Sequence, residues 1–227
     1  MAEQKKTNEA LDMEEALSQS EAFLIQNKKS IIGAVLALVI VVTGIIMYQN
    51  LYAGPREEKA QAALFKGEQY FENDMYEQAL NGDSIGYEGF LKVADEFSGT
   101  DAANLAHAYA GICYAHLGKY DEAIKTLDQF SGKDQLVAPA MQAAIGNCYA
   151  QLGQLDKAAS MLIDAAEAAN SQALSPIYLQ QAGEILVKQG KYDDAIKAYT
   201  TIKEKYFRSA QAWSADKYIE QAQQLKK

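Results

Sequence analysis

A short sequence recurs three times in the second half of the chain, and this repeat constrains the fold more than any other feature. The first copy, Gly118–Ile124, reads GKYDEAI, and the third, Gly190–Ile196, reads GKYDDAI at an offset of 72 residues. A more divergent copy, Gly153–Ala159, lies 35 residues after the first and 37 residues before the third. A period of this size is typical of solenoids built from repeated helical hairpins.

A second glycine precedes each copy by seven residues, at Gly111, Gly146 and Gly183. A glycine inside a helix removes the side chain that would hold a neighbouring helix away, so these positions predict close helix crossings. The glycine that opens each copy is expected to end the first helix with a positive φ, and an acidic residue then begins the second helix. A fainter copy lies between Gly67 and Ala79. The sequence therefore predicts about four helical hairpins.

The residues expected to pack the hairpins together are small or aromatic. They are Gly111, Tyr114, Ala123, Gly146, Tyr149, Ala158, Gly183 and Ala195. Leu127, Leu162 and Tyr199 follow the three alanines by four residues and are expected on the same helix face. One hairpin cannot bury both faces of its helices, so the core is predicted to form between stacked hairpins.

This pattern resembles the tetratricopeptide repeat over residues 56–227. The resemblance implies an all-α fold, an α-solenoid that acts as a protein–protein interaction module. The chain departs from the family in its period of 35–37 residues, where the family has 34. Three glycines, Gly82, Gly86 and Gly89, interrupt the first hairpin, so residues 75–86 are expected to form a loop. Ser209–Leu225 is expected to be a C-terminal capping helix.

An apolar run, Ile31–Tyr48, precedes the repeats and contains no formally charged side chain. As a helix it would extend about 27 Å, close to the roughly 30 Å hydrocarbon core of a bilayer. We therefore predict a single transmembrane helix with its flank at residues 31–53. The alternatives are a buried helix of a soluble core and a cleavable signal peptide. The long acidic lead and the lack of a small-x-small cleavage site disfavour the signal peptide.

The flanks of this run predict its orientation. Lys28 and Lys29 precede it directly, and paired lysines favour the cytoplasmic side. Residues 1–30 are then a cytoplasmic arm, and residues 54–227 are an extracytoplasmic domain that begins at Gly54-Pro55. In a bacterium, the chain would be a single-pass protein of the inner membrane with a periplasmic domain.

Two features of the membrane-proximal segment leave alternatives open. Apolar residues at helical spacing between Ala10 and Leu24 fit a short amphipathic helix that docks a partner, or a solvated tail. Gly33 and Ala37 form a small-xxx-small pair, which permits a helix–helix contact in the membrane.

The sequence contains no pattern that indicates catalysis or metal binding. His107 and His116 lie nine residues apart on one expected helix, so they point to opposite faces and cannot share a metal ion. Phosphate-binding and nucleophile motifs are missing. Cys113 and Cys148 occupy equivalent positions in adjacent repeats, about 9–10 Å apart, and are expected to be buried thiols without a disulfide. We predict no enzyme, no cofactor and no metal site.

Binding is the function that remains. In the tetratricopeptide family the first helices of successive hairpins line a concave groove, so the resemblance implies partner-binding residues there. These are Ala108, Ile112, His116, Asn147, Gln151, Gln180, Glu184 and Lys188. Their mixture of apolar and amide side chains suits an extended or helical peptide. Related repeats clamp a terminal carboxylate with lysines, but Ala108 and Ala143 stand at those positions here, so that ligand is not expected.

The layout predicts the kind of partner. Residues 56–227 contain 17 basic and 24 acidic residues, a net charge of −7, which argues against nucleic acid. A short arm, one span and an exported repeat domain are similar to the ancillary tetratricopeptide subunits of the bacterial Sec translocon. That similarity implies a membrane-tethered adaptor or chaperone-like subunit whose partners are translocon subunits, chaperones or exported clients. A structural scaffold of another cell-envelope complex is the alternative.

Overall fold

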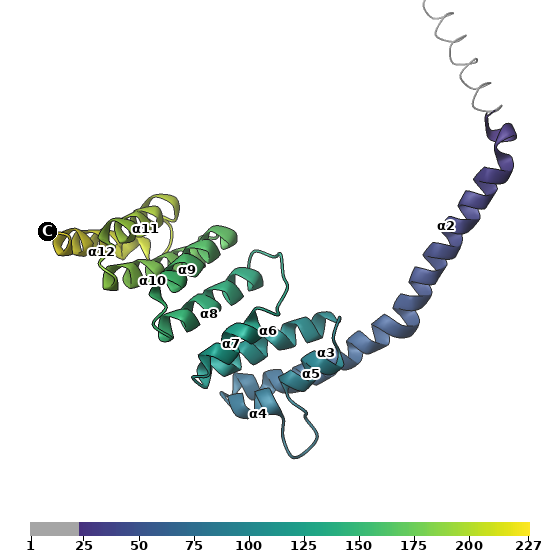
Figure 1. Ribbon diagram of the computed structural model, residues 1–227, viewed down its shortest axis with the longest axis horizontal. Helices are drawn as coiled ribbons and strands as arrows, with labels where there is room; N and C mark the ends of the chain where they lie inside the picture. The colour runs from purple at the N-terminus through teal and green to yellow at the C-terminus, as the bar shows by residue number, and fades with distance from the viewer. Residues whose placement is uncertain (1–22) are drawn as a thin grey trace, which may run out of the picture. The chain divides into compact units, whose positions relative to one another are not determined.

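The computed structural model describes residues 23–227, and the secondary structure in that range is helical without any strand (Figure 1). The chain divides into two compact units, Met1–Pro55 and Arg56–Lys227. The all-α class predicted from the sequence is confirmed.

The first unit contains the apolar helix α2 (Lys28–Tyr48), which continues into a short π-helix, η1 (Gln49–Ala53). By length and composition this helix is apolar enough to cross a membrane. None of the residues of α2 is buried. A helix in a soluble core would be mostly buried, so the structure argues against that alternative. The amphipathic helix expected between Ala10 and Leu24 lies almost entirely outside the described residues.

The second unit is a series of helical hairpins stacked in chain order (Figure 1). Its helices are α3 (Gly54–Glu72), α4 (Tyr76–Asn81), α5 (Phe90–Glu96), α6 (Asp101–His116), α7 (Tyr120–Leu127), α8 (Val137–Gln151), α9 (Leu155–Ala169), α10 (Ser175–Lys188), α11 (Tyr192–Lys205) and α12 (Ala212–Leu225). The last three hairpins are α6–α7, α8–α9 and α10–α11, and α12 covers the last of them. The predicted solenoid and its capping helix are confirmed.

The crossing glycines bring the two helices of each hairpin together. A β-carbon added to Gly183 would lie 2.4 Å from Cε1 of Tyr199, and one added to Gly111 would lie 2.5 Å from Cγ of Leu127. At Gly146 the crossing is looser, with 3.1 Å to Cγ of Leu162. The glycines therefore lie at close crossings, and the side chains that meet them are Leu127, Leu162 and Tyr199, which were expected only on the same helix face as the alanines.

The turn glycines end the first helices in the same way in all three hairpins. Gly118, Gly153 and Gly190 have φ angles of 75°, 74° and 73°. In the first of these turns, the N–H of Lys119 donates to the carbonyl of Tyr114 at 2.9 Å, and the N–H of Gly118 donates to Ala115 at 3.1 Å. This pair of bonds is the Schellman motif, which requires a left-handed residue that glycine adopts without steric cost. The repeated turn sequence therefore specifies the hairpin.

The core follows the solenoid in three consecutive hydrophobic clusters. The first joins α3 to α6, the second joins α6, α7 and α8, and the third joins α8 to α12. Ala123, Ala158 and Ala195, the small residues predicted at the helix crossings, are completely buried. Each cluster includes helices of neighbouring hairpins, so each hairpin depends on its neighbours for burial.

The first hairpin differs from the prediction. Residues 75–86 were expected to form a loop, but Tyr76–Asn81 is helical because Ala79 and Leu80 are buried against the core. The chain leaves the helix only at Gly82, where φ is 93°. Asp83 organises the loop that follows, since its carboxylate accepts the N–H groups of Ile85 at 2.7 Å and Tyr87 at 2.9 Å. The loop therefore occupies residues 82–89.

Candidate partner-binding site

The exposed sides of the first helices carry most of the residues predicted to bind a partner. Residues one and five positions after each crossing glycine lie within about 40° of each other around the helix. These residues are Ile112 and His116 on α6, Asn147 and Gln151 on α8, and Glu184 and Lys188 on α10. Ile112 is half-buried, and the other five are exposed. We call these six residues the first-helix face.

Ala108 does not belong to this surface, although the sequence predicts it there. It is 4% exposed and packs in the core with Leu127 and Met141. A residue three positions before the crossing glycine lies about 60° around the helix from that glycine, between the buried glycine and the first-helix face. Gln180, at the equivalent position of α10, is half-buried, and its amide donates to the carboxylate of Glu184 at 3.0 Å. The prediction is therefore corrected for Ala108.

Leu105 and Ile177 extend the first-helix face but are not among the predicted residues. They lie six positions before Gly111 and Gly183. This spacing places them at the same angle around the helix as the middle of the first-helix face. Both side chains are exposed. The helical spacing of the sequence contains this information, but an apolar residue on an amphipathic helix is ordinarily interpreted as core.

A hollow of about 560 Å³ continues the first-helix face between α10 and α12. Glu184 and Lys188 line it from α10, and Tyr218 and Leu225 line it from α12. The ring of Tyr218 stacks on Tyr199 with their centroids 5.2 Å apart, which fixes that wall. The capping helix α12 therefore also lines a hollow next to the first-helix face, which the sequence did not predict.

The centre of the first-helix face is formed by two amides, Asn147 and Gln151, both exposed on α8. An amide offers a donor and an acceptor, so it can pair with both groups of a peptide backbone. His116 lies to one side of them on α6, and its ring stacks on Tyr76 of α4 at 4.3 Å with an interplanar angle of 7°. The face thus combines hydrogen-bonding groups with a flat, fixed ring.

The two histidines and the two cysteines lie in the repeat unit, where both cysteines are buried. His107 is half-buried, and burial lowers its pKa, so it is held in the neutral form, while His116 is exposed. Among residues 23–227, no group of three or more His, Cys, Asp or Glu side chains is placed to hold a metal ion. Cys113 and Cys148 are buried free thiols, as predicted. Burial raises the pKa of Cys113 to about 12, which removes its nucleophilic form at neutral pH.

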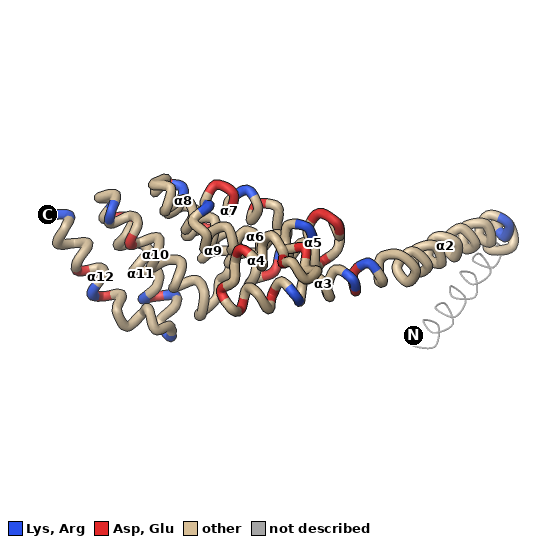
Figure 2. Tube along the Cα trace, turned by 90° about the horizontal axis from the view of Figure 1, so that it is seen from below, with Lys and Arg blue, Asp and Glu red and all other residues tan. Residues whose placement is uncertain are grey.

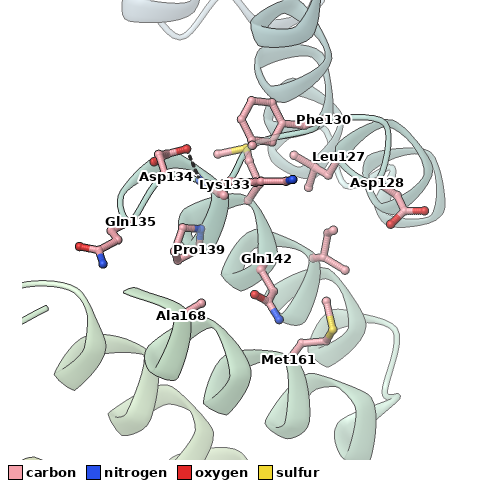
Figure 3. A pocket seen from close by; sticks show the side chains of 14 residues that line it. Leu127, Asp128, Phe130, Lys133, Asp134, Gln135, Pro139, Gln142, Met161 and Ala168 are labelled. Carbon is pink, nitrogen blue, oxygen red and sulfur yellow. Dashed lines mark hydrogen bonds between the residues drawn. The ribbon is translucent and has the colours of Figure 1, made fainter. Parts of the chain in front are cut away.

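A second hollow, of about 520 Å³, lies beside α7, α8 and α9 (Figure 3). It exists because α7 ends at Leu127 after eight residues, whereas α9 has 15. Phe130 and Met161 contribute apolar surface to its lining. At its rim Asp134 accepts the N–H of Leu136 at 2.8 Å, and such bonds lower the pKa of its carboxyl group. None of the predicted binding residues lines this hollow.

A third hollow, of about 460 Å³, separates the second helices α9 and α11. Lys191 spans its end and pairs with Asp156 at 2.6 Å. Gln189 also donates to Asp156 at 2.7 Å, and these two donors lower the pKa of that carboxyl group, Lys191 having the larger effect. The contacts join neighbouring hairpins on the side formed by the second helices, so they are a structural link.

Comparison with known protein families identifies a match. A family model described as a tetratricopeptide repeat-like domain matches residues 21–220. The matched stretch includes α2 as well as the hairpins. No curated protein matches the chain.

Proposed function

The chain belongs to the tetratricopeptide repeat-like family, and we propose that it is a membrane-tethered module for protein–protein interaction. In this proposal α2 crosses the membrane and the hairpins of Arg56–Lys227 hold the partner. The exposed, unburied surface of α2 supports the tether. The family match supports the same assignment, because it begins before α2 and runs through the repeats.

The observation that carries the binding role is the first-helix face with its adjoining hollow. Asn147 and Gln151 are solvated in the free protein, so a partner has to replace the lost water with its own hydrogen bonds. An extended or helical segment with an accessible backbone satisfies that requirement. Apolar side chains of the same segment would pack on Leu105, Ile112 or Ile177. The face thus fits a peptide or a loop of a partner protein.

We place the repeats outside the cytoplasm because Lys28 and Lys29 flank the start of α2. Residues 1–30 are then a cytoplasmic arm, residues 31–53 the span with its flank, and residues 54–227 the exported domain. In a bacterium these would be the inner membrane and the periplasm. The layout supports an adaptor or chaperone-like subunit at or near the Sec translocon, with translocon subunits, chaperones or exported clients as partners.

A photo-crosslinking experiment in cells tests both the face and the partner. A benzophenone amino acid replaces Asn147 or Glu184, and the matched control places it at Ser160, an exposed residue of α9. We expect protein adducts from the first two positions and none from the control. Adducts that contain translocon subunits would support the adaptor role, and adducts with another envelope complex would support the scaffold. Adducts of equal yield from Ser160 would contradict the proposed face.

A further inference from the structure

The loops between hairpins lie along one edge of the repeat unit. In stacked hairpins, the turns within hairpins and the loops between them fall on opposite edges. Two contacts connect neighbouring elements at the edge of the inter-hairpin loops. The amide of Asn104 donates to the carbonyl of Ser131 at 2.7 Å, and Gln172 donates to the carbonyl of Lys205 at 3.1 Å. The loops that follow α7, α9 and α11 therefore share this edge.

Large apolar side chains are exposed along this edge. They are Leu136, Val137, Phe207 and Trp213. We call these four residues the inter-repeat edge. Trp213, the single tryptophan of the chain, is 89% exposed, and Phe207 is 60% exposed. Tryptophan and phenylalanine bury large apolar areas when they contact a partner, so the exposure of both at the connection between α11 and α12 requires an explanation.

The opposite edge has a different composition. In the last three hairpins, the turns within hairpins contain no exposed large apolar residue among the residues described. The second helices begin there, and their first turns carry acidic residues, namely Asp121, Glu122, Asp156, Asp193 and Asp194. In the last three hairpins, one edge therefore exposes large apolar residues, whereas the other exposes acidic residues together with Lys119 and Lys191.

Basic residues surround the aromatic end of the inter-repeat edge. Residues 203–217 contain four basic and two acidic residues, a net charge of +2, although residues 56–227 have a net charge of −7. Arg208 lies 5.5 Å from the ring centroid of Phe207. Figure 2 shows acidic positions grouped around α4, α5 and α7, whereas both signs alternate along α10 to α12. The aromatic end is thus the part of this acidic domain suited to an anionic surface.

We propose that the inter-repeat edge binds the surface of a lipid bilayer that contains anionic headgroups. Tryptophan prefers the boundary between lipid and water, and lysine or arginine beside it binds anionic headgroups. The four apolar residues come from two places, the start of α8 and the segment that leads into α12, and a fluid bilayer accepts separate side chains without a complementary rigid shape. This inference rests on the proposed tether, which would raise the local concentration of the repeat unit at the membrane, so that individually weak contacts are sufficient.

Fluorescence of the full-length chain tests the proposal, since Trp213 is the single tryptophan. The chain is reconstituted into lipid nanodiscs of phosphatidylcholine, with or without phosphatidylglycerol, and with acyl chains that carry bromine as a quencher. In discs with phosphatidylglycerol we expect blue-shifted emission and a loss of at least half the intensity with brominated lipid. Emission that resembles free tryptophan, without quenching in either disc, would overturn the proposal.

Charge variants provide the matched control. Lys205→Gln with Arg208→Gln should reduce the quenching at least threefold. Lys125→Gln with Lys157→Gln removes the same charge from the second helices and should leave the quenching unchanged. An equal loss of quenching in the two pairs of variants would mean that only net charge matters. That result would contradict specific binding of the inter-repeat edge to lipid. A Trp213 that is unquenched in discs but crosslinks to a protein in cells would also contradict lipid binding.

Insertion of α2 into the membrane and binding of the inter-repeat edge to lipid can be tested separately. Resistance of the chain to carbonate extraction from vesicles reports insertion of α2, whereas Trp213 reports contact of the edge with lipid. If α2 does not insert, Trp213 still measures binding of the unanchored chain to vesicles that contain phosphatidylglycerol.

Discussion

Replacing Gly183 by alanine should destabilise the repeat unit, although alanine favours helix. The added β-carbon would lie 2.4 Å from Cε1 and 2.6 Å from Cζ of Tyr199. Tyr199 is 2% exposed and stacks on Tyr218, so its ring has little room to move. Overpacking of this kind costs about 1–3 kcal/mol, and the higher helix propensity of alanine returns up to about 1 kcal/mol. We therefore expect a net loss of roughly 1–2 kcal/mol.

Gly146→Ala is the matched control. Its β-carbon would lie 3.1 Å from Cγ of Leu162, a more flexible side chain, so a small shift can accommodate it. The gain in helix propensity should then make this variant neutral within about 1 kcal/mol. Gly183→Ala combined with Tyr199→Leu imitates the α8–α9 hairpin, where Leu162 stands at that position and the crossing is looser, and should recover part of the loss.

The assay is thermal unfolding of the full chain in detergent, followed by circular dichroism. For a unit of this size, a loss of 1–2 kcal/mol lowers the midpoint by roughly 2–8 °C. A Gly183→Ala variant with the same unfolding midpoint as the wild type would refute the crossing geometry. An equal loss in Gly146→Ala would refute the argument that the rigid ring is the cause.

Three further predictions concern the thiols, the start of α8 and the topology. Mass mapping of protein exposed to oxidants should find no bridge between Cys113 and Cys148, and a bridge would mean that the helices approach more closely than described. The lowered pKa of Asp134 makes its contribution to stability complete above about pH 4, and the contribution is lost as the pH falls through that pKa. Asp134→Asn should therefore weaken the dependence of the unfolding free energy on pH at acidic pH. An unchanged dependence would contradict the stabilising role of the Asp134 carboxylate. A reporter active only outside the cytoplasm should work after Lys227 and be silent at the N-terminus, and the reverse pattern would invert the orientation.

Local sequence rules were sufficient for the hairpins. The positive φ at Gly118 and the close approach of Leu127 to Gly111 each require a glycine. Both positions can therefore be recognised in the sequence. The short helix Tyr76–Asn81 was missed because three nearby glycines indicate a loop, while burial of Ala79 and Leu80 depends on residues far along the chain. Tertiary packing therefore determines that this segment is helical.

The candidate site was predicted less completely than the fold. Asn147 and Lys188 are exposed as expected, but the core status of Ala108 depends on contacts with α7 and α8 that no local pattern specifies. The hollow beside α7 follows from the early end of that helix, and its lining comes from three different helices and a loop. Surfaces of this kind depend on how the hairpins stack, so the spacing within one repeat cannot reveal them.

The affinity of the partner identified by crosslinking tests the central claim most directly. It is measured for the wild type, for Asn147→Ala with Gln151→Ala, and for the matched pair Ser160→Ala with Glu167→Ala on α9. Truncating central residues of an interface typically costs about 2 kcal/mol or more, which corresponds to roughly a 30-fold loss of affinity. We expect that loss from the first pair and less than a twofold change from the second. Wild-type affinity in the first pair, with the fold intact, would contradict binding at the first-helix face.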